Sequence, residues 1–222
     1  MEKTIKVFND YKFPIEPAHL TTMGEYNQSL CLFKTMFELD EHSLPVSSIF
    51  KSWKYNQDKK LYELALNEVT WSDGKNLDTH QIKLSITRLE KVAPESYRSI
   101  LSLLKDSSKK SIEIVDKRRI NLHVNKPEVE IFKRLTGAFI PIVRKELLHD
   151  KDQTIDNHDY SLAGYIVEKH DHKSEILILK ANKHYYKYND RMPQRIEMKN
   201  QSQKKEKFSG VFSAEQWDNL VL

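Results

Sequence analysis

Four of the nine histidines cluster between positions 149 and 172 and could bind a metal ion: His149, His158, His170 and His172. Imidazole nitrogen is a good ligand for nickel, copper and zinc. In His170-x-His172 both rings could lie on one side of an extended turn. A metal site requires further ligands, and the sequence identifies none. We therefore interpret the pair as the solvated tip of a hairpin and predict neither a metal site nor a cofactor.

The acidic residues and glycines form no catalytic or ion-binding motif. Asp150-x-Asp152 with Asp156 is similar to the start of a calcium loop. The sixth position holds Ile155 and the twelfth Ser161, where an EF-hand requires glycine and glutamate. The chain has five glycines and lacks a glycine-rich phosphate loop, a nucleophile elbow and a His-Glu-x-x-His helix. The sequence predicts a protein that is not an enzyme.

The charge pattern does not indicate binding to nucleic acid. The chain has 36 basic and 32 acidic residues and a net charge of +4. Its basic residues are scattered along the sequence, whereas nucleic-acid-binding domains collect them on one face. The densest run, Lys204-Lys205-Glu206-Lys207, is typical of a solvated linker. No apolar run approaches the roughly 18 residues of a membrane span.

Cys31 is the single cysteine, which excludes an internal disulfide. It lies in a stretch where Tyr26, Leu30, Phe33 and Phe37 recur at helical spacing. This spacing predicts an amphipathic helix. We expect a buried and unreactive thiol here, because free cysteine is among the most buried residue types.

Helices and strands alternate along the chain without a long series of parallel β-α-β units, which predicts one mixed α/β body. Asp78 and Gln81 fit a capping box at the start of a helix that should run to about Val92. A hairpin is expected across Asn56 to Lys59. The other expected strands are 4–7, 112–115, 120–124, 165–169 and 175–179, and the other expected helices are 26–37, 95–104 and one from Pro127 to Gly137.

Trp71-Ser72-Asp73-Gly74 joins the alternating strand 61–66 to the capped helix at Asp78. Gly74 suits the backbone φ of a turn, Asp73 can bond the backbone ahead, and Trp71 offers a large apolar face. We therefore predict that the tetrapeptide is structural and does not touch a ligand. Its place between strand and helix resembles the family 5 solute-binding proteins of bacterial ABC importers, which carry oligopeptides, dipeptides or nickel.

Further motifs match this family in the same order along most of residues 11–200. Leu44-Pro45 with Ser52-Trp53 resembles its P-x-L-A-x-x-W, Tyr62 to Leu66 its Y-x-F-x-L-R, Ala163-Gly164-Tyr165 its G-P-Y, and Ile178 to Asn182 with Tyr185-Tyr186 its L-x-R-N-P-x-Y-W. The family's T-A-x-D is replaced by Asp78-Thr79-His80-Gln81, and the proline of G-P-Y is missing. These departures affect the expected specificity more than the fold.

The resemblance implies a mixed α/β fold of the periplasmic-binding-protein type II class. Residues 1–42 and 158–222 would form part of the ligand-facing lobe, and residues 43–157 would form an inserted subdomain. The second lobe of the clamp has no counterpart in this sequence. By analogy, the residues expected to line the ligand cleft are His19, Thr21, Glu25, Tyr97, Gly164 and Tyr165. Two of them have a plainer explanation, since Tyr97 fits a helix core and Gly164 a turn.

The function implied by the resemblance is the capture of oligopeptides or related small solutes for delivery to an ABC permease in the membrane. The protein would act as a monomer in the periplasm or at the cell surface. The N-terminus, Met1 to Val7, has no apolar signal segment, so we expect that such a segment is missing from this sequence. One lobe alone should bind its ligand weakly or not at all.

Two alternatives stay open at this point. The chain could be the solute-sensing domain of a cytoplasmic regulator, whose DNA-binding domain would lie outside this sequence. It could also be a shortened relative that has lost transport and acts as an interaction module through its apolar segment 208–222, which contains Phe212, Trp217 and Leu220. The codons upstream and the length of the reading frame would discriminate among these functions.

Overall fold

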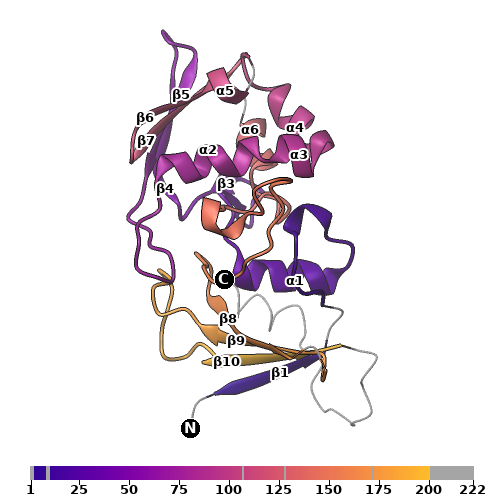
Figure 1. The fold of residues 1–222 in the computed structure, drawn as a ribbon. Helices are drawn as coiled ribbons and strands as arrows, with labels where there is room; N and C mark the ends of the chain where they lie inside the picture. Colours follow the sequence, from indigo (N-terminus) through magenta and orange to yellow (C-terminus); the bar gives the residue numbers. More distant parts are fainter. Residues whose placement is uncertain (1–2, 9–10, 107, 128, 172, 201–222) are drawn as a thin grey trace.

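Two four-stranded β-sheets form opposite ends of the structure, and helix α1 lies between them (Figure 1). The computed structural model describes residues 3–8, 11–106, 108–127, 129–171 and 173–200. Its strands are β1 (Thr4–Phe8), β2 (Glu38–Leu39), β3 (Pro45–Val46), β4 (Phe50–Asn56), β5 (Leu61–Leu66), β6 (Ile112–Asp116), β7 (Arg119–His123), β8 (Tyr165–Asp171), β9 (Ile176–Ala181) and β10 (Arg195–Lys199). Its helices are α1 (Met23–Leu32), α2 (Thr79–Thr87), α3 (Leu89–Val92), α4 (Pro94–Leu101), α5 (Ser108–Ser111) and α6 (Glu130–Arg134), with short 3-10 turns at Pro17–His19 and Lys145–Leu147.

The first sheet has the strand order β1-β10-β9-β8. β1 runs parallel to β10, whereas β10, β9 and β8 are antiparallel neighbours. Because side chains alternate across a strand, Val7, Leu179, Ile196 and Met198 are buried in one cluster. The predicted opening strand and the hairpin of β8 and β9 are confirmed. The sequence analysis missed β10, although its buried Ile196 and Met198 alternate with charged residues.

The second sheet has the order β4-β5-β7-β6, with every neighbouring pair antiparallel. The hairpin predicted across Asn56 to Lys59 is confirmed, and the strands expected at 112–115 and 120–124 form the hairpin of β6 and β7. Helices α2, α3 and α4 lie along one side of this sheet (Figure 1), and α2 contacts β6. Leu64 and Leu122 of the strands are buried in the same cluster as Ile82 and Ile86 of α2.

Each sheet has its own hydrophobic cluster, but the chain crosses between the two clusters repeatedly. Met36 and Phe37 belong to the cluster of the second sheet. Val143 and Ile155 belong to the cluster of the first sheet. These crossings tie the two parts of the structure together. The division into 1–42 with 158–222 and 43–157 stays a prediction.

Helix α1 ends earlier than predicted. Phe33 has extended backbone angles, with φ −126° and ψ 144°, and the segment from Phe33 to Phe37 is buried without being helical. The helical spacing of these aromatic residues was therefore misleading, because an extended segment reaches both clusters. The buried position of Cys31 is confirmed. Burial raises the pKa of its thiol to about 12, so the thiolate form is not populated near neutral pH.

The capping box at the start of α2 is confirmed. The N–H groups of His80 and Gln81 donate to Asp78 Oδ1 at 3.0 and 3.2 Å, and Gln81 Oε1 accepts from the Asp78 N–H at 3.2 Å. The helix expected to continue to Val92 is divided at Arg88 into α2 and α3. The helices expected at 95–104 and from Pro127 to Gly137 are shorter than predicted, since α4 ends at Leu101 and α6 covers Glu130–Arg134.

The turn Trp71 to Gly74 is part of the scaffold. Trp71 is 1% exposed, and its Nε1 donates to Gln81 Oε1 at 3.0 Å. Gly74 has a φ of +80°, which disfavours other residues. Arg144 Nη1 donates to Asp73 Oδ2 at 3.0 Å, and its guanidinium lies 5.5 Å from the Trp71 ring. The tetrapeptide thus connects the start of α2, through Gln81, to Arg144. These contacts support the structural role predicted for it.

Candidate ligand-facing surface around helix α1

A capping box holds the loop that leads into α1. Thr22 Oγ1 accepts from the Glu25 N–H at 3.1 Å. Glu25 Oε2 accepts from the Thr21 N–H at 2.7 Å and from Thr21 Oγ1 at 3.0 Å. The carboxylate also lies at the positive end of the helix dipole. Thr21 and Glu25, two of the predicted ligand residues, are therefore in contact with each other, and this contact fixes the loop.

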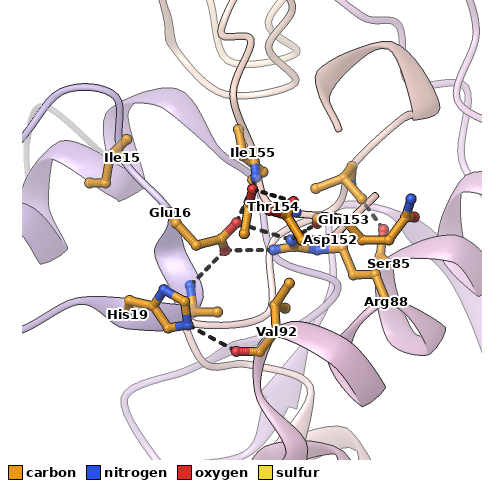
Figure 2. A network of polar contacts seen from close by, with 12 residues as sticks. Ile15, Glu16, His19, Ser85, Arg88, Val92, Asp152, Gln153, Thr154 and Ile155 are labelled. Atoms are coloured by element: carbon orange, nitrogen blue, oxygen red, sulfur yellow. Dashed lines mark hydrogen bonds and ion pairs between the residues drawn. The ribbon is translucent and has the colours of Figure 1, made fainter. Parts of the chain in front are cut away.

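A buried ion pair between Glu16 and Arg88 fixes the same loop further upstream (Figure 2). Arg88 Nη2 donates to Glu16 Oε1 at 2.9 Å, and Arg88 Nη1 donates to Glu16 Oε2 at 3.1 Å. The Glu16 carboxylate also accepts from the N–H groups of Ala18 and Ile155 at 2.9 and 2.7 Å. One carboxylate thus joins the loop after β1, the end of α2 and the loop before Ile155.

The electrostatics of this network keep Glu16 ionised. Burial by itself would raise the pKa of Glu16, but the hydrogen bonds and the positive charge of Arg88 outweigh burial and lower it below its ordinary value. Next to the pair, His19 Nε2 lies 2.9 Å from the Val92 carbonyl oxygen at the end of α3 (Figure 2). The rest of His19 is exposed. The contact with α3 thus orients the His19 ring, and this predicted ligand residue is open to solvent.

A pocket of about 290 Å³ lies beside α1. Its lining combines aromatic and aliphatic side chains with one ion pair: Tyr26, Leu30, Phe33, Lys34, Thr35, Glu38, Leu39, Thr136, Ala163 and Tyr185. Large apolar side chains continue beyond this lining. Met23 is 71% exposed one helical turn before Tyr26, and the ring of Phe139, 42% exposed, lies 6.5 Å from the Tyr26 ring. We call Met23, Tyr26, Leu30, Leu39 and Phe139 the α1 surface.

The other three predicted ligand residues, Tyr97, Gly164 and Tyr165, are buried. Tyr97 belongs to the cluster of the second sheet. Tyr165 is 1% exposed, and its hydroxyl donates to the Pro193 carbonyl oxygen at 3.2 Å. A Cβ at Gly164 would lie 3.3 Å from Met192 Cε, so close packing accounts for this glycine. Their proposed place in a ligand cleft stays a prediction.

Three of the histidines predicted as a possible metal-binding group are among the described residues, and each has contacts to other residues. His149 Nδ1 lies 3.1 Å from Asp152 Oδ1. His158 Nε2 lies 3.0 Å from the Ile15 carbonyl oxygen, and burial lowers the pKa of this ring. His170 is part of β8 and its ring lies 4.7 Å from the Phe13 ring, so it is not at the hairpin tip as expected. His172 lies outside the described residues.

Among the described residues, no group of three or more His, Cys, Asp or Glu side chains comes together as a metal site would require. In the same part of the chain, every helix is too short or too polar to cross a membrane. The apolar segment 208–222 and the lysine run 204–207 lie outside the described residues.

Sequence reasoning missed the residues that form the pocket. Tyr26 and Leu30 were assigned to a buried helix stripe, yet they are only half-buried, and the buried side of α1 carries Gln28 and Ser29. Lys34 was not singled out, because an isolated lysine has no motif. The Thr22-x-x-Glu25 pattern is the one local signal that indicates where α1 begins.

The fold is that of the type II periplasmic binding proteins. It is similar to the Escherichia coli murein tripeptide binding protein MppA, with a TM-score of 0.70 at 18% identity. It is also similar to Listeria monocytogenes OppA bound to peptide (0.71, 15%) and to NikZ from Campylobacter jejuni in complex with Ni(L-His) (0.65, 22%). Each match covers 90% of this chain, but only 42%, 42% and 39% of the other chain. The chain therefore spans less than half of the length of the proteins it matches, which is the extent expected of a single lobe.

Residues 45–211 match the family model described as bacterial extracellular solute-binding proteins, family 5 Middle. The chain belongs to this family. The resemblance inferred from the motifs around Trp71 to Gly74 is thereby confirmed. The comparison with curated protein sequences gives no match. Family membership concerns solute binding in general and leaves the solute itself open.

Proposed function

We propose that this chain contributes to solute capture by the substrate-binding component of an ABC importer, with a short peptide as the solute. The α1 surface and its pocket are the observation that carries this proposal. Exposed apolar side chains grouped beside a pocket are typical of a binding surface. The similar proteins MppA and OppA are described with a tripeptide and a peptide, respectively, which favours a peptide over a nickel complex.

The α1 surface has the geometry expected of one wall of a binding site. The loop before α1 is fixed by the Glu16–Arg88 pair and by the Thr22–Glu25 capping box, so the α1 surface needs little ordering when a ligand arrives. A rigid, preformed wall lowers the entropic cost of binding. A second wall would close over the ligand, as in hinge-bending binding proteins. The binding protein would then deliver the solute to a permease without any chemical reaction.

This proposal places the protein outside the cytoplasmic membrane, as a monomer that meets the permease. Because one wall makes only part of the contacts, the isolated chain should bind peptide weakly, with Kd on the order of 1 mM, about −4 kcal/mol. The positions His19, Thr21, Glu25, Tyr97, Gly164 and Tyr165 remain candidates for contact. Of these we favour His19 and Thr21, since both are exposed next to α1.

Equilibrium titration of the chain with a mixture of short peptides tests this function. Met23→Asp, which places a charge on the α1 surface, should abolish the binding. Val115→Asp is the matched control, because Val115 is 46% exposed on a different part of the structure, in the β6–β7 hairpin. Equal loss of binding in both variants, or no peptide binding at all, would contradict the proposal. Preference for Ni(L-His) over every peptide would contradict the choice of solute.

A further inference from the structure

Lys34 and Glu38 form an ion pair inside the pocket beside α1. The Lys34 side chain is 9% exposed and that of Glu38 is 30% exposed. The backbone fixes the position of Lys34, because its carbonyl oxygen accepts from the Ile142 N–H at 2.8 Å and Thr35 pairs with Pro141. The lysine is thus held in place by the scaffold, independently of its own ion pair.

Two positive charges lie beside the Tyr186 ring, next to the pocket. Lys34 Nζ lies 5.4 Å from the centre of this ring, and Lys187 Nζ lies 5.5 Å from it. Of the two ammonium groups, that of Lys34 is paired with the Glu38 carboxylate. Burial, and next the like charge of Lys187, lower the pKa of Lys34 to about 8. An additional anion would balance the remaining positive charge.

Lys34 also retains hydrogen-bonding capacity. An ammonium group has three N–H donors. One contacts Glu38, and the Tyr186 hydroxyl lies 3.5 Å away, at the limit of a hydrogen bond. Lys34 lines a pocket whose other walls include the apolar and aromatic side chains of Tyr26, Leu30 and Tyr185. Hydrogen bonds to charged groups are stronger in such surroundings than in water.

We propose that this pocket binds the carboxylate of a small ligand that also carries an apolar or aromatic group, with Lys34 as the anion-binding residue. The apolar group lies against Tyr26 and Leu30, and the carboxylate joins Glu38 at the lysine ammonium. This inference deepens the proposed function and rests on it, because it defines which end of a solute meets this wall. The free C-terminus of a peptide with an apolar last residue has the required chemistry.

Amide-resolved NMR titration of the chain with three matched probes tests the inference. Hydrocinnamate carries the carboxylate, hydrocinnamamide is its neutral counterpart, and phenylpropylammonium carries the opposite charge. Hydrocinnamate should shift the amides of Tyr26 to Leu39 and bind at least about tenfold more tightly than the amide, the difference expected for one charge-assisted hydrogen bond. The cation should bind more weakly still. Equal binding of the carboxylate and the amide would overturn the inference.

Variants separate a binding role of Lys34 from a structural one. Lys34→Met should remove the preference for the carboxylate, whereas Glu38→Gln, which removes the competing negative charge, should strengthen hydrocinnamate binding at least about threefold. Lys54→Met, an exposed lysine on β4, is the control and should change nothing. If Lys34→Met fails to fold, the comparison of probes on the unmodified chain and the Glu38→Gln variant still decide the matter.

The proposed function and this inference can fail separately. Peptides that shift the α1 surface equally with a free or an amidated C-terminus would overturn the carboxylate site and leave peptide binding intact. The absence of shifts with peptides and with all three probes would overturn both. Shifts with hydrocinnamate that persist unchanged in Lys34→Met would overturn the role of Lys34.

Discussion

Arg88 at the end of α2 and Glu16 in the loop before α1 lie 72 residues apart in the chain and form an ion pair with two hydrogen bonds of 2.9 and 3.1 Å. The Arg88 side chain is fully buried. Its Nη1 also donates to the Gln153 carbonyl oxygen at 3.0 Å. This pair connects the end of α2 to the loop whose exposed residues we propose to face the ligand (Figure 2).

Loss of Arg88 should strongly destabilise the protein. Arg88→Met leaves the Glu16 carboxylate buried without its partner, and breaking a buried ion pair in this way costs about 3–5 kcal/mol. Urea denaturation at neutral pH measures the free energy of unfolding. Arg98→Met is the control, because the Arg98–Glu95 pair is exposed and exposed pairs contribute at most about 1 kcal/mol. Similar effects of the two changes would contradict the importance of the buried pair.

The contribution of Glu16 to stability should depend on pH with a defined sign. The pKa of Glu16 is lowered in the folded state from its ordinary value of 4.5. Its stabilising effect is therefore complete above that value and is lost as the pH falls through the lower folded-state pKa. The stability difference between the unmodified chain and Glu16→Gln should shrink between about pH 7 and about pH 3. A difference that stays constant over this range would argue against an ionised Glu16.

Gly74 should be required for the turn and dispensable for ligand binding. At a φ of +80°, Gly74→Ala should lower the free energy of unfolding by about 1 kcal/mol. Gly137→Ala is the control, because the added Cβ would meet its nearest neighbour, in the Phe139 side chain, at an ordinary distance of 3.7 Å. Peptide titrations of Gly74→Ala should match those of the unmodified chain. Lost binding in a folded Gly74→Ala protein would mean that the turn contacts the ligand.

Two helix caps provide a paired test of what orders the α1 surface. Thr22→Ala and Asp78→Ala each remove a side-chain cap and should each cost about 1 kcal/mol of stability. Only Thr22→Ala should also weaken peptide binding, since it loosens the loop with Thr21 and Glu25. Thermal unfolding and peptide titration of both variants are compared. Weakened peptide binding in both variants, or in neither, would contradict the idea that the Thr22 capping box orders the ligand-facing loop.

Local signals made the second sheet predictable and left the α1 region uncertain. Asp78 and Gln81 form a capping box whose partners lie three residues apart, so the sequence displays it directly. The aromatic residues Phe33 and Phe37 have helical spacing, yet the segment between them is not helical. Phe33 packs in the cluster of the first sheet and Phe37 in that of the second, among residues that are distant in sequence. Long-range packing decided that conformation, and no local pattern reports it.

The candidate site was less predictable than the fold for the same reason. Glu16 and Arg88 are far apart in the sequence, and they meet only after folding has brought the loop after β1 next to the end of α2. The pocket depends on Lys34, Ala163 and Tyr185, which come from three distant segments. The motif residues Trp71 to Gly74, by contrast, identified the family while lying in the scaffold. The most informative pattern in this sequence therefore indicates ancestry and leaves the binding surface to be found from the structure.

The central claim is that the α1 surface is the wall that meets a peptide. Amide-resolved NMR of the chain during titration with mixed short peptides tests it most directly. We predict shifts confined to the loop from His19 to Thr22, to helix α1 and to the pocket beside it. The amides of β4 and β6, on the second sheet, should stay unchanged. Shifts centred on the second sheet, or an unchanged spectrum at peptide concentrations of about 10 mM, well above the expected Kd, would contradict the account.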